Sequence, residues 1–227
     1  METILPGVHQ VSRGVNAFIV DGDEGVTLID TGLPKQQGRI EAGLRQIGRS
    51  LDDVQAIAIT HAHTDHVGGA AVLKASTGAP LYASETDAPA IRGEEAKPLP
   101  PVLDRFSFII PLYRLLPDGE GVDVDHVVGE ADLLPSDLTV IASPGHTPGH
   151  VSYLLEREGG VLFVGDAAVA TRAGQVKRGW MNRSTPVFDA SLRHIAEFDF
   201  TVACFGHSRA IASDAGGAFR RFAAGLA

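Results

Sequence analysis

Short apolar runs recur along the chain between turn residues, and they limit the folds open to it. Each run has the length and the β-branched or aromatic content of a strand. Helix-like periodicity lies between them, at 37–47, at 69–76 and from 184 onward. The runs are VNAFIV (15–20), VTLID (26–30), VQAIAI (54–59), LTVIAS (138–143), HVSYLL (150–155), VLFVG (161–165) and TVACF (201–205). Strands that alternate with helices in this way predict a mixed α/β chain.

One of these segments is repeated. FIVDGDEGVTLIDTG (18–32) aligns without gaps to YLLEREGGVLFVGDA (153–167), and the apolar positions agree on both sides of a shared Gly-Val. Each copy has the pattern of a β-hairpin that ends in a polar turn, with Asp30 in one copy and Asp166 in the other. Any two hairpins can look alike, but a true repeat predicts two similar halves packed sheet against sheet.

Composition narrows the classes of partner. The 227 residues can form a real core, and we expect a single domain over 1–227. A formal net charge of -9 disfavours nucleic acid and anionic membranes as partners. The sequence has no signal-peptide pattern and no apolar run of roughly 20 residues, so we expect a cytoplasmic protein. The single cysteine, Cys204, lies in an apolar run and is expected to be buried.

The stretch ITHAHTDHVGG (59–69) crowds four side chains that can bind metal onto one turn. In extended chain, His61 and His63 point the same way and can bind one ion, whereas Asp65 and His66 are turned toward a second position. Imidazole together with carboxylate suits Zn, Fe or Mn better than Mg or Ca. A metal site is therefore predicted here.

One loop cannot fill the coordination shells of two ions. Further candidates each stand just after a strand-like run: His146 after LTVIAS, Asp166 in VLFVGD and His207 after TVACF. A rigid strand end can hold such a ligand in place. The other histidines, His9, His126 and His194, have no partner at ligand spacing and are expected at the surface.

With these residues, the chain resembles the metallo-β-lactamase superfamily from VTLIDTG to FGHS, and all five sequence motifs of that family match in order. The resemblance implies a four-layer αβ/βα sandwich of two similar halves. It also implies a role for each matching position. His61, His63 and His146 would bind a first ion, Asp65, His66 and His207 a second, and Asp166 would bridge both, while Asp30 would support the metal loop without binding metal. His150, four residues after His146, either orients the site through a hydrogen bond or is simply the start of the strand HVSYLL.

Two divalent ions, Zn in preference to Fe or Mn, would share a hydroxide acting as nucleophile, with Asp65 as the catalytic residue that orients it. The expected reaction is hydrolysis of an activated acyl bond (ester, lactone or thioester) in a small, partly apolar substrate.

The chain differs from several branches of the family, and these differences narrow the expected activity. Family β-lactamases generally lack an aspartate at the position of Asp166. Glyoxalase II enzymes carry a glutathione-binding domain that the residues after His207 are too few to form, and lactonases carry a tyrosine where this chain has Val169. A persulfide dioxygenase with one iron, held by His61, His146 and Asp166, stays open as the alternative activity.

Residues 85–135 form an apolar insert in this pattern. Such a segment can be a lid, a pocket wall, a helix packed on the core or a contact in a homodimer. Insertions in the family commonly border the metal cleft, so we expect a substrate pocket walled by Phe106, Phe108, Ile109, Leu112 and Tyr113.

Overall fold

Two β-sheets lie face to face in the computed structural model, which describes residues 1–11, 14–98, 119–179, 182 and 184–226. The first sheet has the order β1-β2-β3-β4-β5-β6-β7, antiparallel as far as β4 and parallel from β4 to β7. Its strands are Glu2–Leu5, Val8–Gln10, Phe18–Gly22, Gly25–Ile29, Val54–Ala58, Leu81–Ser84 and His126–Val128.

The second sheet has the order β14-β11-β10-β9-β8, in which only β11 and β14 are parallel. Its strands in that order are Val202–Phe205, Val161–Gly165, Val151–Leu155, Leu138–Ala142 and Leu133–Leu134. A separate pair, β12 (Ala168–Ala170) and β13 (Val176–Arg178), follows β11.

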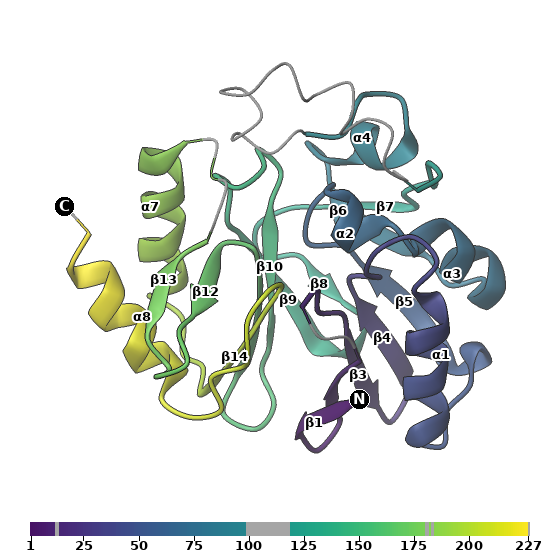
Figure 1. Cartoon of the computed structure of the whole chain (residues 1–227), viewed down its shortest axis with the longest axis horizontal. Helices are drawn as coiled ribbons and strands as arrows, with labels where there is room; N and C mark the ends of the chain where they lie inside the picture. The colour runs from purple at the N-terminus through teal and green to yellow at the C-terminus, as the bar shows by residue number, and fades with distance from the viewer. Residues whose placement is uncertain (12–13, 99–118, 180–181, 183, 227) are drawn as a thin grey trace.

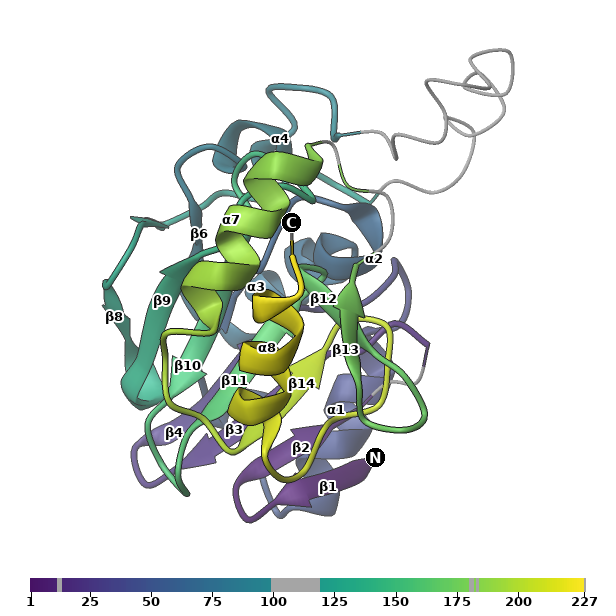
Figure 2. The same cartoon turned by 90° about the vertical axis from the view of Figure 1, so that its left-hand side faces the viewer.

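Helices cover the outer face of each sheet (Figure 1). On the first sheet these are α1 (Gln37–Gln46), α3 (Ala70–Thr77) and the short α2 (Thr64–Val67) and α4 (Ala88–Arg92). On the second sheet they are α7 (Thr185–Ile195) and α8 (Ala215–Ala224), which stand in front of the strands in Figure 2. Short 3-10 turns, Leu51–Asp53 and Pro135–Asp137, precede β5 and β9. The expected four-layer αβ/βα sandwich is confirmed.

Three apolar clusters fill the spaces between the four layers. The central one lies between the sheets, where Phe18 of β3 meets Phe163 of β11 with ring centroids 5.4 Å apart. The outer clusters pack each sheet on its helices, and neighbouring residues of one strand enter different clusters: Ile19 faces α1 whereas Phe18 faces the other sheet. Because both faces of these strands are buried, their sequences are nearly unbroken apolar runs. Cys204 is fully buried in the central cluster, as predicted.

The two copies of the sequence repeat both form antiparallel hairpins, whose registers differ by one residue. In β3–β4, Phe18 pairs with Ile29, whereas in β10–β11, Tyr153 pairs with Phe163 and not with Val164, which aligns with Ile29. The residues at the end of the two hairpins, Asp30 just after β4 and Gly165 as the last residue of β11, share a positive φ. Asp30 has φ 56°, and Gly165, which aligns with it, also has φ 56°. A left-handed residue therefore ends both hairpins and turns the chain toward the shared edge of the sheets.

Several elements were not predicted, chiefly the short strands β1, β2, β6, β7 and β8, the β12–β13 pair and helix α8. The prediction for His9 was wrong. His9 lies in β2 and is 7% exposed, with Nδ1 3.0 Å from the Thr3 hydroxyl. Within 85–135, the described residues form α4, β7 and β8. The predicted pocket residues of this range lie outside the described part of the chain. No helix among the described residues is both long and apolar enough to span a membrane.

Truncating Phe163 to alanine should lower the free energy of unfolding by about 3–5 kcal/mol, because Phe163 is 1% exposed at the contact between the sheets. Chemical denaturation measures the change. Leu133→Ala is the control, since Leu133 is 69% exposed and its removal should cost less than about 0.5 kcal/mol. Equal losses in the two variants would contradict this account of the core.

Candidate metal centre

The predicted site residues meet at the carboxyl ends of strands from both sheets. Asp30 follows β4 and His61 lies just beyond β5, whereas His146, Asp166 and His207 follow β9, β11 and β14. These strand ends share one edge of the sandwich, which is why residues far apart in sequence come together. Six of the nine histidines lie here, counting His66, His63 and His150 with the three just named.

Two buried hydrogen bonds join the sheets directly beneath the site. The backbone N–H of Val151 donates to the carbonyl of Thr60 at 2.9 Å, and the Tyr153 hydroxyl donates to the carbonyl of Ile59 at 2.8 Å. The loop that carries His61 is thus fixed to the sheet that carries His146 and Asp166.

A first group consists of three imidazoles. Nδ1 of His63 lies 3.1 Å from Nε2 of His61 and 2.9 Å from Nε2 of His146. All three rings are buried, at 1%, 8% and 1% exposure for His61, His63 and His146. Nitrogens that bind one tetrahedral zinc at about 2.0–2.1 Å are roughly 3.3 Å apart, so this spacing is close to that of a shared ion. The three residues could hold a metal.

Burial keeps His61 and His63 neutral. Desolvation holds the pKa of His61 well below its usual value, and it lowers the pKa of His63 to about 3, with His146 adding to the effect. An imidazole that does not take up a proton keeps a lone pair for a metal ion.

A second group lies beside the first and contains carboxylate as well as imidazole. Nε2 of His207 is 3.0 Å from Oδ2 of Asp65, which is 3.8 Å from Nε2 of His66. Nε2 of His66 is buried and has no hydrogen-bond partner among the described residues. Although burial lowers it, Asp166, Asp30 and Asp65 hold the pKa of His66 well above its usual value, so this position attracts a positive charge, either a proton or a metal ion. These three residues could also hold a metal.

The carboxylate of Asp166 lies between the two groups. Its Oδ2 is 3.4 Å from Nε2 of His146 in the first group and 3.3 Å from Nε2 of His207 in the second. Its Oδ1 is 3.4 Å from Nε2 of His66 and is buried without a hydrogen-bond partner in the described part of the chain. Although burial raises it, the pKa of Asp166 is held well below its usual value by His66 and His207. Asp166 is therefore a charged carboxylate with an unused oxygen.

Asp30 determines which nitrogens face the centre. Its carboxylate accepts a hydrogen bond from Nδ1 of His66 at 2.7 Å and others from the backbone N–H and the hydroxyl of Thr60, each at 2.8 Å. Because the Thr60 hydroxyl donates to Asp30, it accepts from Nδ1 of His61 at 3.0 Å. Because Nδ1 of each ring is the donor in these bonds, Nε2 is the nitrogen that each ring can offer to an ion at the centre.

His150 holds the backbone of Asp166 in place. Its Nε2 accepts a hydrogen bond from the backbone N–H of Asp166 at 3.0 Å, so its proton is on Nδ1, which donates to the Ser143 hydroxyl at 2.8 Å. Gly165 packs on the same ring, and a Cβ there would lie 2.5 Å from Nε2 of His150. The left-handed turn before Asp166 thus needs a glycine both for its conformation and for this close approach.

Asp87, at the residue before α4, was missed by the sequence analysis. It is 3% exposed, and its side chain reaches the loops of both His61 and His146. In sequence it resembles an ordinary helix-capping aspartate before Ala-Pro, which gave no signal for this role.

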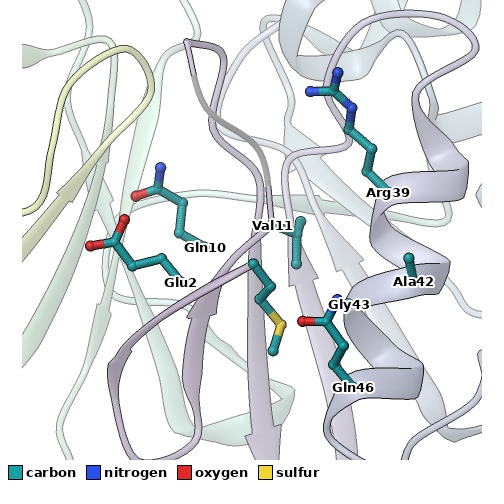
Figure 3. A pocket seen from close by; sticks show the side chains of 8 residues that line it. Glu2, Gln10, Val11, Arg39, Ala42, Gly43 and Gln46 are labelled. Atoms are coloured by element: carbon teal, nitrogen blue, oxygen red, sulfur yellow. The ribbon is translucent and has the colours of Figure 1, made fainter.

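Two hollows lie in the described surface near the N-terminal strands. One, of about 340 Å³, lies between β1–β2 and α1, and Gln10, Val11, Arg39 and Gln46 line it (Figure 3). None of the predicted metal-binding residues borders it. The other, of about 500 Å³, is bordered by His207 and also by Asn16, Arg172 and Arg209. Only the second hollow adjoins the metal centre.

Comparison with known proteins agrees with this geometry. The sequence profile of the metallo-beta-lactamase superfamily matches residues 12–207. The probable metallo-hydrolase YflN of Bacillus subtilis is 32% identical over 150 residues, which are 63% of this chain and 55% of YflN. A hydroxyacylglutathione hydrolase of Dechloromonas aromatica is 32% identical over 187 residues, 82% of this chain and 51% of that enzyme. This chain therefore spans just over half the length of either relative.

The fold has close counterparts among solved structures. A metallo-beta-lactamase family protein of Thermus thermophilus superposes with a TM-score of 0.71 and 25% identity, covering 98% of this chain and 80% of that one. Because the family profile covers most of the sequence and the sandwich places its motif residues at one edge, the chain belongs to the metallo-beta-lactamase superfamily.

The metal-free chain should lose stability as the pH rises from about 7 to about 10. Although burial lowers it, hydrogen bonds to Asp166 and Asp65 raise the pKa of His207 from 6.5 to about 10. A raised pKa stabilises the fold fully below the unfolded value of 6.5, and this contribution is lost as the pH passes the folded value. Melting temperatures of the metal-free chain should fall over this window, and the fall should be smaller in His207→Gln. Parallel curves for the two proteins would contradict the assignment.

Proposed function

We propose that the chain is a metal-dependent hydrolase that binds two divalent ions, preferably zinc, and cleaves an activated acyl bond. The observation that carries the proposal is the position of Asp166. Its two oxygens lie 3.3–3.4 Å from imidazoles of both groups, and one of them is buried without a hydrogen-bond partner among the described residues. A carboxylate in that position is suited to be shared by two ions.

The donor set fits such ions. His61, His63 and His146 would hold the first, and Asp65, His66 and His207 the second, with Asp166 common to both. Neutral imidazoles with two carboxylates suit zinc, with iron or manganese as alternatives. When bound, the ions supply a water acidic enough to attack at neutral pH and a positive charge that polarises a carbonyl oxygen.

Asp65 is the residue we assign to orient the attacking water. Burial raises its pKa, but His66 and His207 outweigh burial and lower it to about 2, so Asp65 is a carboxylate throughout the working range. A carboxylate accepts hydrogen bonds and does not donate them. Asp65 can therefore accept a hydrogen bond from the water and direct its lone pair toward a substrate carbonyl.

The substrate class rests on the family and on the site. A relative named hydroxyacylglutathione hydrolase supports hydrolysis of an acyl bond. The hollow of about 500 Å³ beside His207 is large enough for a small molecule. We therefore infer an ester, lactone or thioester as substrate. Separately, we expect the protein to act in the cytoplasm.

Metal analysis together with two assays tests the proposal. The purified chain should bind close to two zinc ions and hydrolyse small aryl esters, lactones or thioesters, with activity that a chelator removes and zinc restores. The persulfide dioxygenase alternative predicts one iron and oxygen uptake with a persulfide substrate. One iron with oxygen uptake and no hydrolysis would overturn the proposal, as would full hydrolysis with a single ion.

Replacing Asp166 by alanine should lower kcat/KM for hydrolysis by at least about a hundredfold, because both ions would lose a common ligand. The fold should persist by circular dichroism, since the backbone N–H of Asp166 still donates to His150. Asp23→Ala, in the exposed turn between β3 and β4, is the matched control and should keep its activity. A folded Asp166→Ala variant with near-normal turnover would show that Asp166 is not the shared ligand.

A further inference from the structure

Asp87 is a buried carboxylate whose side chain does not cap its own helix, α4. It stands at the residue before α4, where an aspartate side chain would ordinarily accept a hydrogen bond from its own helix, yet it makes no such bond. The side chain points instead into the interior and is 3% exposed. A carboxylate is buried in this way only when other groups satisfy its oxygens.

Those groups belong to the two loops that carry the three-histidine group. Oδ2 of Asp87 accepts from the backbone N–H of Ala62 at 2.9 Å and from the hydroxyl of Thr147 at 2.8 Å. Oδ1 accepts from the backbone N–H of Gly149 at 3.0 Å. Ala62 lies between His61 and His63, and Thr147 follows His146. One carboxylate thus joins the backbones beside all three imidazoles.

The packing around Asp87 leaves it little freedom. A Cβ at Gly149 would lie 2.5 Å from Oδ1 of Asp87 and 2.5 Å from the hydroxyl of Ser84. The backbone N–H of Asp87 in turn donates to that hydroxyl at 3.2 Å. The end of β6 thus holds the backbone of Asp87, and the loop of His146 packs against its carboxylate.

We infer that Asp87 is a positioning residue for the metal position formed by His61, His63 and His146. It fixes the distance between the loops of His61 and His146, which follow strands of different sheets. Nδ1 of His63 thereby stays 3.1 Å from Nε2 of His61 and 2.9 Å from Nε2 of His146. The inference rests on the proposed function, since it needs an ion at that position. Asp30 does the corresponding work for His66 by contacting the ring itself.

The experiment measures two stepwise zinc affinities by competition with a chromophoric chelator. His63→Ala and His207→Ala assign the two steps to the two positions, since each removes a ligand from one of them. Asp87→Asn should weaken the His61–His63–His146 step by about tenfold to a hundredfold and leave the other step within about threefold. The asparagine amide cannot accept all three hydrogen bonds from Ala62, Thr147 and Gly149. One of the two carboxylate oxygens becomes an NH2 group, which would face another donor.

Thr147 supplies a milder pair of variants in case Asp87→Asn does not fold. Thr147→Val removes one of the three hydrogen bonds and should weaken the same step, whereas Thr147→Ser keeps the hydroxyl and should restore it. Asp125→Asn is the matched control. Asp125 accepts a backbone hydrogen bond from Leu81 at 2.7 Å and pairs with Lys74, on the amino end of β6 away from the centre.

The melting temperature of each metal-free variant shows whether a loss of zinc affinity comes with a loss of overall stability. Loss confined to the one step, beyond any loss in Asp125→Asn, supports the inference. Equal weakening of both steps, or unchanged affinities in both Asp87→Asn and Thr147→Val, overturns it while leaving the proposed function standing. Absence of zinc binding in the unmodified chain overturns both.

Discussion

The hydrogen bonds of Asp30 are the interaction on which the proposed metal centre depends. One carboxylate fixes the proton of His66 directly and that of His61 through the Thr60 hydroxyl. These rings belong to different groups of the centre, so Asp30 makes both present Nε2 toward Asp166 and the neighbouring imidazoles. With the opposite tautomer, each ring would place an N–H where an ion must bind, and neither group could hold a cation.

The two halves of the sandwich use equivalent turns for different purposes. Asp30 and Gly165 align in the repeat and share φ 56°. In the first half the position carries a side chain that orients ligands. In the second half it has no side chain, because His150 occupies the space and accepts the backbone N–H of the next residue, Asp166. A repeated hairpin thus supplies the orienting carboxylate at one end and the central carboxylate at the other.

The candidate metal centre could be predicted from the sequence because its metal-binding residue types are concentrated at a few positions. Histidines crowded at 61–66, and His146, Asp166 and His207 placed after apolar strands, are rare enough to stand out. The longer strands were also predictable, because burial on both faces makes them continuous apolar runs.

Other features carried no such signal. Asp87 accepts from the backbone N–H of Ala62, the hydroxyl of Thr147 and the backbone N–H of Gly149, which are 25, 60 and 62 residues away. Every residue except proline has a backbone N–H, so such partners cannot be recognised from residue types. His9 was predicted at the surface because no possible metal ligand lies near it in sequence. It is buried because its short strand, β2, pairs with β1 and β3. Helix α8 has glycines at two of its first three positions, and its packing on α7 and on the second sheet explains its stability.

Anomalous diffraction from crystals of the zinc-loaded protein tests the central claim most directly, because it locates each ion without reference to activity. The account predicts two zinc peaks. One should lie among Nε2 of His61, Nδ1 of His63 and Nε2 of His146, the other should lie beside Nε2 of both His66 and His207, and the Asp166 carboxylate should stand between them. A single peak bound only by the three histidines, or two peaks with Asp166 turned away from both, would contradict it.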